Sequence, residues 1–253
     1  MGRMPGAVQV IHAVTRRFRK LLFWLRGGTH YQQDFSNPIL SEALGRVTRQ
    51  SHIVDHLGTL FFFALDARPK LMVELGTGAG ESTRALLAAA SITKSILLSV
   101  DREDCRGLDL PFKQYWHFVQ SDDIEFGRTG FVGWCSSHAL KPQIDLLFID
   151  TSHWYEHTKQ EIAIWGPFLS NSGTMILHDT NMGKGPYGRM DGSVGFGYDN
   201  KRGVIRAMEE YTERRYDEKL FFCDLAKGLL IMHHPHSAGL AVIKKYEFTG
   251  RET

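Results

Sequence analysis

Residues 71–87 read LMVELGTGAGESTRALL, and this stretch decides the fold. The apolar run at 71–75 has the length of a buried strand, and Gly76, Gly78 and Gly80 follow at alternate positions. Residues 82–90 are rich in Ala and Leu, which favours a helix. A strand, a glycine turn and a helix in this order open a doubly wound α/β fold. The turn lets a ligand lie against the backbone, and the helix points free N–H groups at it.

The residue in front of the glycines indicates the kind of ligand. A dinucleotide site usually reads G-x-G-x-x-G, whereas this chain reads E-x-G-x-G-x-G with Glu74 first. A carboxylate there would repel a pyrophosphate and suits an ammonium group. The pattern resembles motif I of the Rossmann-like S-adenosylmethionine (SAM) methyltransferases, whose ligand carries a methionine amine. This resemblance implies cofactor contacts from Glu74, Gly76, Thr77, Gly78, Gly80 and Ser82. A tight turn without a ligand is the structural alternative.

Length and composition limit the class of protein. The 253 residues suffice for one large α/β domain, alone or with a small cap. A net charge of +2 gives no global case for nucleic-acid binding. Cys105, Cys135 and Cys223 are scattered, which fits reduced thiols in a cytoplasm and gives no metal spacing. No run is long enough to span a bilayer. We therefore expect a cytoplasmic protein without a nucleic-acid partner.

The N-terminal part is predicted to be helical. Residues 8–25 mix basic and apolar side chains, which suits a membrane-surface helix or, as we favour, a helix that packs on the domain or on a second subunit of a homo-oligomer. Residues 41–67 repeat apolar positions at three and four, so a helix there would complete a cap at 1–67 in front of a domain at 68–253. His52 and His56 lie one helical turn apart; a packed pair is favoured over a metal pair.

Acidic residues follow the next two predicted strands. Residues 95–100 form a strand that ends at Asp101, where a nucleotide fold places an acid against ribose hydroxyls. Helix capping is the alternative role of Asp101. Residues 116–120 form another strand, and the resemblance implies that an acid after it meets the adenine amine. We assign this contact to Asp122 in preference to Asp123.

Two further carboxylates are expected to meet at one edge of the sheet. Asp150 follows a strand at 144–149, and Asp179 follows one at 174–177. Two neighbouring carboxylates repel each other, and a divalent cation such as magnesium relieves the repulsion. Such a cation would lower the pKa of an acceptor hydroxyl. His153, three residues after Asp150, is the natural general base.

The segment at 148–180, FIDTSHWYEHTKQEIAIWGPFLSNSGTMILHDT, sharpens the resemblance. It looks like the second half of metal-dependent O-methyltransferases that act on sugars of natural products, such as the macrolide-sugar enzymes and the cephalosporin-hydroxylase-type family. The layout is also similar to that of catechol O-methyltransferases. By resemblance Asp150 and Asp179 would be metal ligands and His153 the base. Here His178 stands where that pattern has an acid, so the third ligand is His178, Asn181 or water. Without a metal, the two aspartates would contact SAM or cap helices.

The C-terminal third supplies a loop and the last strands. Residues 182–200 are glycine-rich with spaced aromatic residues, which suits a lid or substrate loop; a dimer contact is the alternative. Residues 201–216 read as a helix, and 221–223, 228–233 and 240–246 as strands. His233, His234 and His236 are interpreted as a solvated turn in preference to a metal tract.

Together these features predict an α/β protein with a Rossmann-like, doubly wound, mixed seven-stranded sheet and an N-terminal helical cap. The predicted function is SAM-dependent methyl transfer to a hydroxyl of a small natural product, with a sugar or a polyketide-like molecule as the expected acceptor. The enzyme is expected to use a divalent metal and to act in antibiotic biosynthesis. Two alternatives stay open: a metal-independent enzyme that uses His153 as base, and a SAM-binding partner protein without activity. An NAD-dependent dehydrogenase is disfavoured by Glu74 and the glycine spacing.

Overall fold

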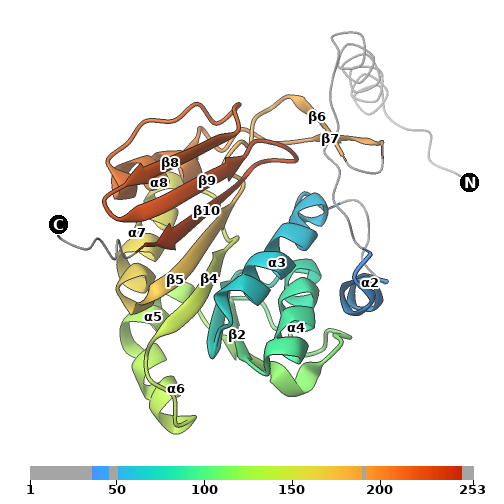
Figure 1. Ribbon diagram of the computed structural model, residues 1–253, viewed down its shortest axis with the longest axis vertical. Helices are drawn as coiled ribbons and strands as arrows, with labels where there is room; N and C mark the ends of the chain where they lie inside the picture. The colour runs from blue at the N-terminus through green and yellow to red at the C-terminus, as the bar shows by residue number, and fades with distance from the viewer. Residues whose placement is uncertain (1–35, 46–50, 190–191, 247–253) are drawn as a thin grey trace, which may run out of the picture.

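The computed structural model describes residues 36–45, 51–189 and 192–246. Their main sheet has eight strands in the order β3-β2-β1-β4-β5-β10-β9-β8 (Figure 1). The strands are β1 Leu71–Leu75, β2 Ile96–Asp101, β3 Trp116–Gln120, β4 Ile144–Ile149, β5 Leu169–His178, β8 Phe222–Ala226, β9 Leu229–His234 and β10 Leu240–Lys245. Strands β3 to β5 pair in parallel, and β10, β9 and β8 continue the sheet antiparallel. The Rossmann-like α/β prediction is confirmed, with one strand more than the seven expected.

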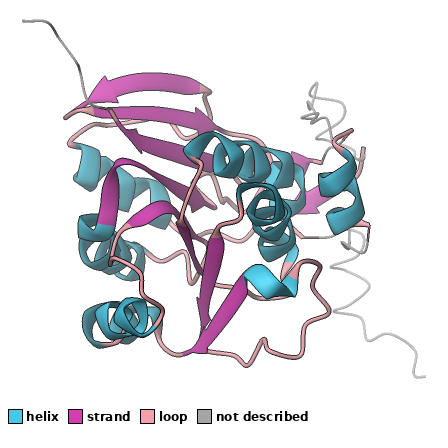
Figure 2. Cartoon of the chain, turned by 60° about the horizontal axis from the view of Figure 1, so that its bottom comes forward, coloured by secondary structure: helices cyan, strands magenta, loops and turns pink. Residues whose placement is uncertain are grey.

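Helices cover both faces of this sheet (Figure 2). They are α2 Pro38–Leu44, α3 Leu57–Ala67, α4 Glu81–Thr93, α5 Asp123–Thr129, α6 Phe131–Ser137, α7 Tyr155–Trp165 and α8 Gly203–Thr212, with short 3-10 turns at Ile53–His56, Lys113–Tyr115 and Gly166–Phe168. Successive side chains of β1 point to opposite faces of the sheet and pack in two hydrophobic cores, one on each face. Val73 and Leu75 pack with α5 to α8, and Met72 packs with α2 to α4. A strand buried on both faces explains its continuous apolar run.

The strand register brings the functional loops to one edge. Leu75 of β1 lies beside Ile149 of β4, and Ile149 lies beside Leu177 of β5. Because these strands are parallel, the residues that follow each of them emerge at the same end of the sheet. The glycine turn, Asp150 and Asp179 therefore share one edge, as the sequence predicts.

The predicted helix at 41–67 is interrupted. Helix α2 ends at Leu44, where Gly45 is the C-cap residue, and the chain resumes helical structure with the 3-10 turn at Ile53. Helices α2 and α3 share one hydrophobic core with α4 and the sheet. The hydrophobic core therefore continues across residue 67. A separate N-terminal cap at 1–67 stays a prediction. The basic segment at 8–25 lies outside the described residues.

The C-terminal third differs from the prediction in two places. Strand β5 begins at Leu169 and is therefore longer than the strand predicted at 174–177, and its register against β4 shifts between Ile144 and Leu146. The glycine-rich segment at 182–200 contains a hairpin of β6 Pro186–Gly188 and β7 Val194–Phe196. Strands of three residues among glycines leave little periodicity to recognise.

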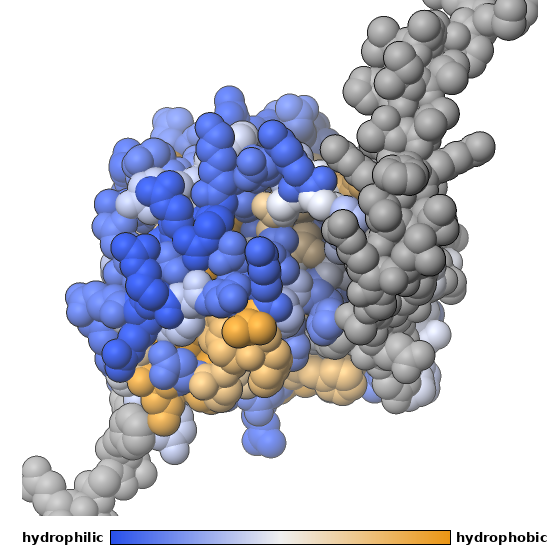
Figure 3. Space-filling view, turned by 90° about the horizontal axis from the view of Figure 1, so that it is seen from above, coloured by the Kyte–Doolittle hydropathy of each residue, from blue (hydrophilic) through white to orange (hydrophobic). Residues whose placement is uncertain are grey.

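Strand β8 forms the free edge of the sheet and exposes apolar side chains. Leu220, Phe221 and Leu225 in this segment are more than half exposed. Figure 3 shows hydrophobic side chains gathered on part of the face seen from above, beside a largely hydrophilic surface. None of the described helices is long and apolar enough to cross a membrane. Assembly through the N-terminal helices stays a prediction.

Candidate active site

The glycine turn after β1 is fixed by its contact with the neighbouring strand end. Gly76 has φ +85°, and a Cβ built there would lie 2.1 Å from the carbonyl oxygen of Asp150. Its N–H donates to the carbonyl of Val100 at 2.9 Å, and the N–H of Asp150 donates to Leu75 at 2.9 Å. Only glycine fits this close approach. The turn therefore lies directly against the loop that carries Asp150.

Glu74 lies beneath the glycine turn and is fully buried. Its carboxylate accepts hydrogen bonds from the hydroxyls of Ser82 at 2.7 Å, Thr83 at 2.8 Å and Ser99 at 2.6 Å. Burial raises the pKa of Glu74 to about 7, against the opposing effect of these hydroxyls. In this arrangement Glu74 ties the start of α4 to β2. Its predicted contact with an ammonium group, and the SAM contact predicted for Ser82, stay predictions.

Asp101, at the end of β2, supports the turn from the other side. Its Oδ2 accepts from the backbone N–H of Thr77 at 2.7 Å and of Gly78 at 3.0 Å. Its Oδ1 accepts from the N–H of Glu103 at 2.9 Å. The carboxylate therefore holds the glycine turn, and its predicted ribose contact stays a prediction. Gly80, with φ +80°, begins α4 as its N-cap and packs against leucine side chains.

A cavity of about 330 Å³ opens beside the turn. Its lining is Gly76, Gly78, Val100, Asp101, Arg102, Ser121, Asp123, Asp150, Thr151, Ser152 and His157. The lining contains Asp123 where we predicted Asp122. The reason is local: Asp122 is the N-cap of α5, and its Oδ1 accepts from the N–H of Glu125 at 3.0 Å. The structure therefore places Asp123 at the cavity wall, and the adenine contact of Asp122 stays a prediction.

Asp150, His153 and Asp179 converge next to this cavity. His153 Nε2 lies 2.9 Å from Asp150 Oδ1, and its Nδ1 lies 2.9 Å from Asp179 Oδ2. His153 and Asp179 both have positive φ, at 61° and 57°. Non-glycine residues in this conformation are strained and cluster at functional sites. The loop after β4 and the loop after β5 thus present both carboxylates to one imidazole.

His178 contacts the same carboxylates from the buried side. Its Nδ1 lies 3.1 Å from Asp150 Oδ1 and 3.2 Å from Asp179 Oδ1, and its side chain is 2% exposed. At this edge of the sheet, Asp150, His153 and Asp179 place their ligand atoms within 4.8 Å of one another, and His178 is not part of that group. The geometry therefore favours His153 over His178 as the imidazole nearest a shared cation. Asn181, the other predicted candidate, instead donates to the carbonyl of Pro235 at 2.7 Å.

Asp150 and His153 shift the pKa values of each other's side chains, and Asp179 also shifts the pKa of His153. Burial alone would lower the pKa of His153, but hydrogen bonds to Asp150 and Asp179 outweigh it and raise the pKa to about 12. Burial alone would raise the pKa of Asp150, but the charge of His178 and the hydrogen bond from His153 lower it. Without a cation, His153 is therefore an imidazolium ion held between two carboxylates. An imidazolium has no lone pair with which to act as a base.

A divalent cation fits this group chemically. The two carboxylates are donors that magnesium or manganese accepts, and an imidazole in the same shell would open the site to manganese, iron or zinc. Asp179 Oδ1 is buried and makes no hydrogen bond within the described residues, although His178 Nδ1 lies 3.2 Å from it. A buried carboxylate oxygen without a donor is costly unless a cation or a proton compensates it.

The glycine-rich segment reaches over the same group. The hydroxyl of Tyr198 is hydrogen-bonded to Nδ1 of His153. Asn200 donates to the carbonyl of Asp179 at 2.9 Å. Tyr187 of β6 packs edge-on against His52, with ring centroids 5.5 Å apart. The segment at 182–200 therefore covers the site, as a lid or substrate loop would.

The other histidines of interest are packed. His56 is fully buried, and its Nε2 lies 2.9 Å from the carbonyl of His236. This agrees with the packed interpretation of the His52–His56 pair. The solvated turn predicted for His233–His236 is wrong for His233, which is fully buried on β9. Its Nε2 lies 2.9 Å from the hydroxyl of Thr180, and its Nδ1 donates to the carbonyl of Leu220 at 2.9 Å.

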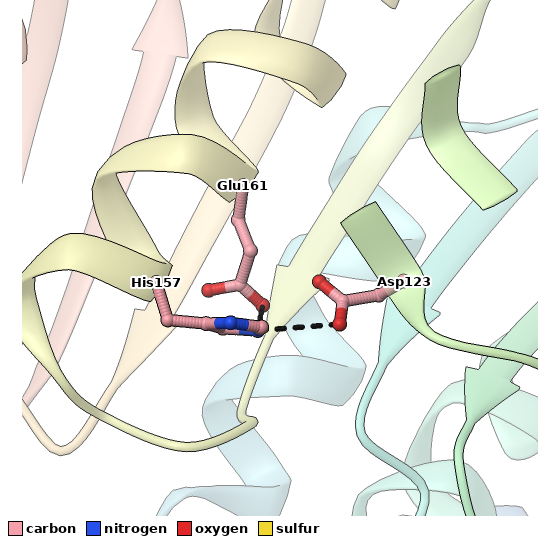
Figure 4. Close-up of side chains that lie close together, drawn as sticks. All are labelled: Asp123, His157 and Glu161. Carbon is pink, nitrogen blue, oxygen red and sulfur yellow. Dashed lines mark ion pairs between the residues drawn. The ribbon is translucent and has the colours of Figure 1, made fainter. Parts of the chain in front are cut away.

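Sequence analysis missed a second group next to the cavity. Asp123, His157 and Glu161 place their ligand atoms within 4.8 Å of one another (Figure 4). The hydrogen bond to Asp123 raises the pKa of His157, and burial raises the pKa of Glu161 to about 8. The spacing of His157 and Glu161, four residues apart on a helix, was a usable signal. The contribution of Asp123 depends on how α5 packs against α7.

Comparisons with known proteins agree with this architecture. Residues 73–180 match a family described as a methyltransferase domain. A cofactor-bound protein from MTB, Rv0187, is 15% identical, with 84% of this chain and 91% of that chain covered and a TM-score of 0.55. The Podospora anserina methyltransferase PaMTH1, solved with SAH, is 12% identical, with 98% and 100% covered and a TM-score of 0.50.

A third solved structure is the MycE methyltransferase from the mycinamycin biosynthetic pathway, in complex with Mg, SAH and mycinamycin VI. It is 14% identical, with 84% of this chain and 55% of that chain covered and a TM-score of 0.52. No curated protein matches the sequence. At these identities the likeness to solved structures establishes a shared fold. Residues 73–180 are thus similar to a methyltransferase domain, within a chain that has a Rossmann-like fold and a cavity beside its glycine turn.

Proposed function

We propose that the chain transfers the SAM methyl group to a hydroxyl of a small molecule, with a divalent cation at Asp150 and Asp179. The observation that carries the proposal is the convergence of Asp150, His153 and Asp179 beside the cavity at the glycine turn. Carboxylates and a histidine at this place suit the activation of an oxygen nucleophile. MycE, which shares the fold, was solved with Mg and SAH together with mycinamycin VI.

The glycine turn and the ends of the strands bind and orient the cofactor in this proposal. SAM already carries a reactive methyl group, so the protein's main task is to align the acceptor oxygen with it. Gly76 keeps the turn against the Asp150 loop, so the methyl group and the acceptor site would be held at a fixed separation. Tyr198 and the segment at 182–200 cover the site and would exclude water.

Asp150 and Asp179 would hold the cation, which when bound supplies positive charge that lowers the pKa of the acceptor hydroxyl. Asp150 Oδ1 accepts the Nε2–H of His153 and so fixes the tautomer. The acceptor's proton would then pass to His153 Nδ1, the atom that faces Tyr198. The acceptor oxygen gains the methyl group, and SAM leaves as S-adenosylhomocysteine (SAH).

A metal-independent mechanism of methyl transfer, with His153 as the base, is less well supported. In the cation-free arrangement the two carboxylates raise the pKa of His153 to about 12, which keeps it protonated and unable to accept a proton. A cation shared by the carboxylates would lower that pKa. We therefore favour the metal-dependent enzyme. A sugar or polyketide-like natural product remains our proposed class of acceptor.

The direct test is SAH formation from SAM with a panel of hydroxylated sugars, macrolides and catechols, before and after removal of metal with a chelator. We expect turnover with at least one acceptor, loss of turnover after chelation, and recovery on addition of magnesium or manganese. Asp150→Asn and Asp179→Asn should abolish turnover while SAH binding persists. Full turnover after thorough chelation would refute the metal requirement. SAH binding without turnover on any acceptor would favour the non-catalytic SAM-binding alternative.

A further inference from the structure

Asp123, His157 and Glu161 form a compact group on the α5–α7 side of the sheet. His157 Nε2 lies 3.2 Å from Asp123 Oδ1 and 3.6 Å from Glu161 Oε1. Figure 4 shows the three side chains pointing toward one another, two from α7 and one from the start of α5. This group is separate from Asp150, His153 and Asp179, which come from the loops after β4 and β5.

Two oxygens in this group lack a hydrogen-bond donor. Asp123 Oδ2 and Glu161 Oε2 are buried and unpartnered among the described residues. The side chain of Glu161 is fully buried, and that of Asp123 is 6% exposed. Burying two neighbouring carboxylates with free oxygens is unfavourable unless positive charge lies between them. One imidazolium compensates at most one of the two carboxylates, so the other either keeps a proton or shares a cation.

The spacing suits a small, four-coordinate cation. Zinc binds histidine nitrogen and carboxylate oxygen at about 2.0–2.2 Å in a tetrahedron, which separates neighbouring ligand atoms by roughly 3.4 Å. The observed separations of 3.2 and 3.6 Å lie on either side of this value. Three protein ligands leave one position for water or another ligand. Asp123 and His157 both line the cavity, so that position would open toward it.

Supporting contacts hold the ligands in place. Thr151 donates its hydroxyl to Glu161 Oε1 at 2.7 Å. Trp165 Nε1 donates to the carbonyl of Asp123 at 3.2 Å. A Cβ at Gly127 would lie 2.7 Å from Ile164, so α5 approaches α7 closely. Outer contacts of this kind orient metal ligands and are a regular feature of metal sites.

We propose that Asp123, His157 and Glu161 bind a zinc-type divalent cation, distinct from the cation at Asp150 and Asp179. The cation neutralises the two buried carboxylates and fixes α5 against α7 at the wall of the cavity. Because it joins two helices of the folded chain, its binding stabilises the fold. This proposal does not depend on methyl transfer.

The test uses the full chain with Asp150→Asn and Asp179→Asn, which removes the first site. After removal of metal, zinc is measured by equilibrium dialysis with elemental analysis, and cobalt by visible absorption. We expect one bound equivalent of zinc, a tetrahedral cobalt spectrum, and a higher Tm with zinc. Adding Glu161→Gln should weaken zinc binding by roughly 100-fold or more and remove the Tm shift. Glu156→Gln, an exposed position of the same helix, should change neither.

His157→Gln provides a second variant in the same background in case Glu161→Gln does not fold, with circular dichroism reporting the fold. It should also remove zinc binding. The proposal is wrong if the Asp150→Asn, Asp179→Asn chain binds no zinc, or if it binds zinc equally well after Glu161→Gln or His157→Gln. SAH binding by the same proteins tests the cofactor site separately, so the two proposals can fail independently.

Discussion

His153 Nε2 lies 2.9 Å from Oδ1 of Asp150, three residues earlier in the chain. The short loop after β4 turns back on itself through the positive φ of His153 to make this contact. A Cβ at Gly203 would lie 2.4 Å from the carbonyl of His153, so the start of α8 packs closely on the turn. The imidazole is thus held with Nε2 toward Asp150 and Nδ1 toward the segment that covers the site.

The variant His153→Gln tests whether His153 acts as the general base or as a metal ligand. Without an imidazole to take the acceptor's proton, we expect turnover to fall roughly 100-fold or more. Magnesium affinity, measured by calorimetry with SAH present, should change much less than in Asp179→Asn. His138→Gln, at the partly buried C-cap of α6, is the control and should keep full turnover. If His153→Gln loses magnesium as completely as Asp179→Asn, then His153 is a ligand and not the base.

Tyr198→Phe tests the role of the covering segment. The Tyr198 hydroxyl is hydrogen-bonded to His153 Nδ1, and the ring is 41% exposed. Removing the hydroxyl should lower kcat several-fold and leave the free energy of unfolding within about 0.5 kcal/mol of the wild type. Steady-state kinetics and urea unfolding measure the two effects. An unchanged kcat would show that the hydroxyl takes no part in positioning His153.

Gly76→Ala should be strongly destabilising because its Cβ would collide with the Asp150 carbonyl at positive φ. We expect a loss of roughly 3 kcal/mol or more in the free energy of unfolding, from overpacking and backbone strain together. Gly78→Ala is the matched control, since φ is +51° there but no atom lies within 4 Å. It should cost roughly 1–2 kcal/mol from φ alone. Equal costs in urea unfolding would contradict the close-contact explanation.

Glu74→Gln should change how stability depends on pH. Burial raises the pKa of Glu74 to about 7 in the folded chain, above the value of about 4.3 in an unfolded one. Between these values the folded state binds more protons, so this residue makes stability fall as the pH rises from about 4.3 to 7. Relative to wild type, Glu74→Gln should therefore gain roughly 1–3 kcal/mol between pH 5 and pH 8.

Urea unfolding of both proteins at the two pH values checks this, with Glu125→Gln, an exposed site on α5, as the control. Parallel stability curves for Glu74→Gln and wild type would show that Glu74 is ionised in the folded chain at pH 5.

Local motifs made much of the fold predictable. The strand and turn from Leu71 to Gly80 could be recognised because a doubly buried strand is continuously apolar and the turn needs glycine. Asp150 and Asp179 could be placed together because parallel strands end at one edge. These inferences depend on residues close in sequence or on a rule about sheets.

The remaining features depend on tertiary contacts that periodicity does not show. Asp123 rather than Asp122 lines the cavity because Asp122 caps α5. His233 is buried because β8 and Thr180 close around it. The Asp123–His157–Glu161 group exists because Gly127 lets α5 approach α7. In each case a distant partner decides what a polar side chain does.

The measurement that tests the central claim most directly is calorimetric binding of SAH to the wild-type chain, with and without magnesium, and with NAD as the control ligand. We predict SAH binding in the micromolar range and no NAD binding, because Glu74 and the glycine spacing suit SAM and because the cavity lies directly beside the turn. Absence of SAH binding, or a preference for NAD, would contradict the cofactor assignment and with it the roles of Asp150, His153 and Asp179.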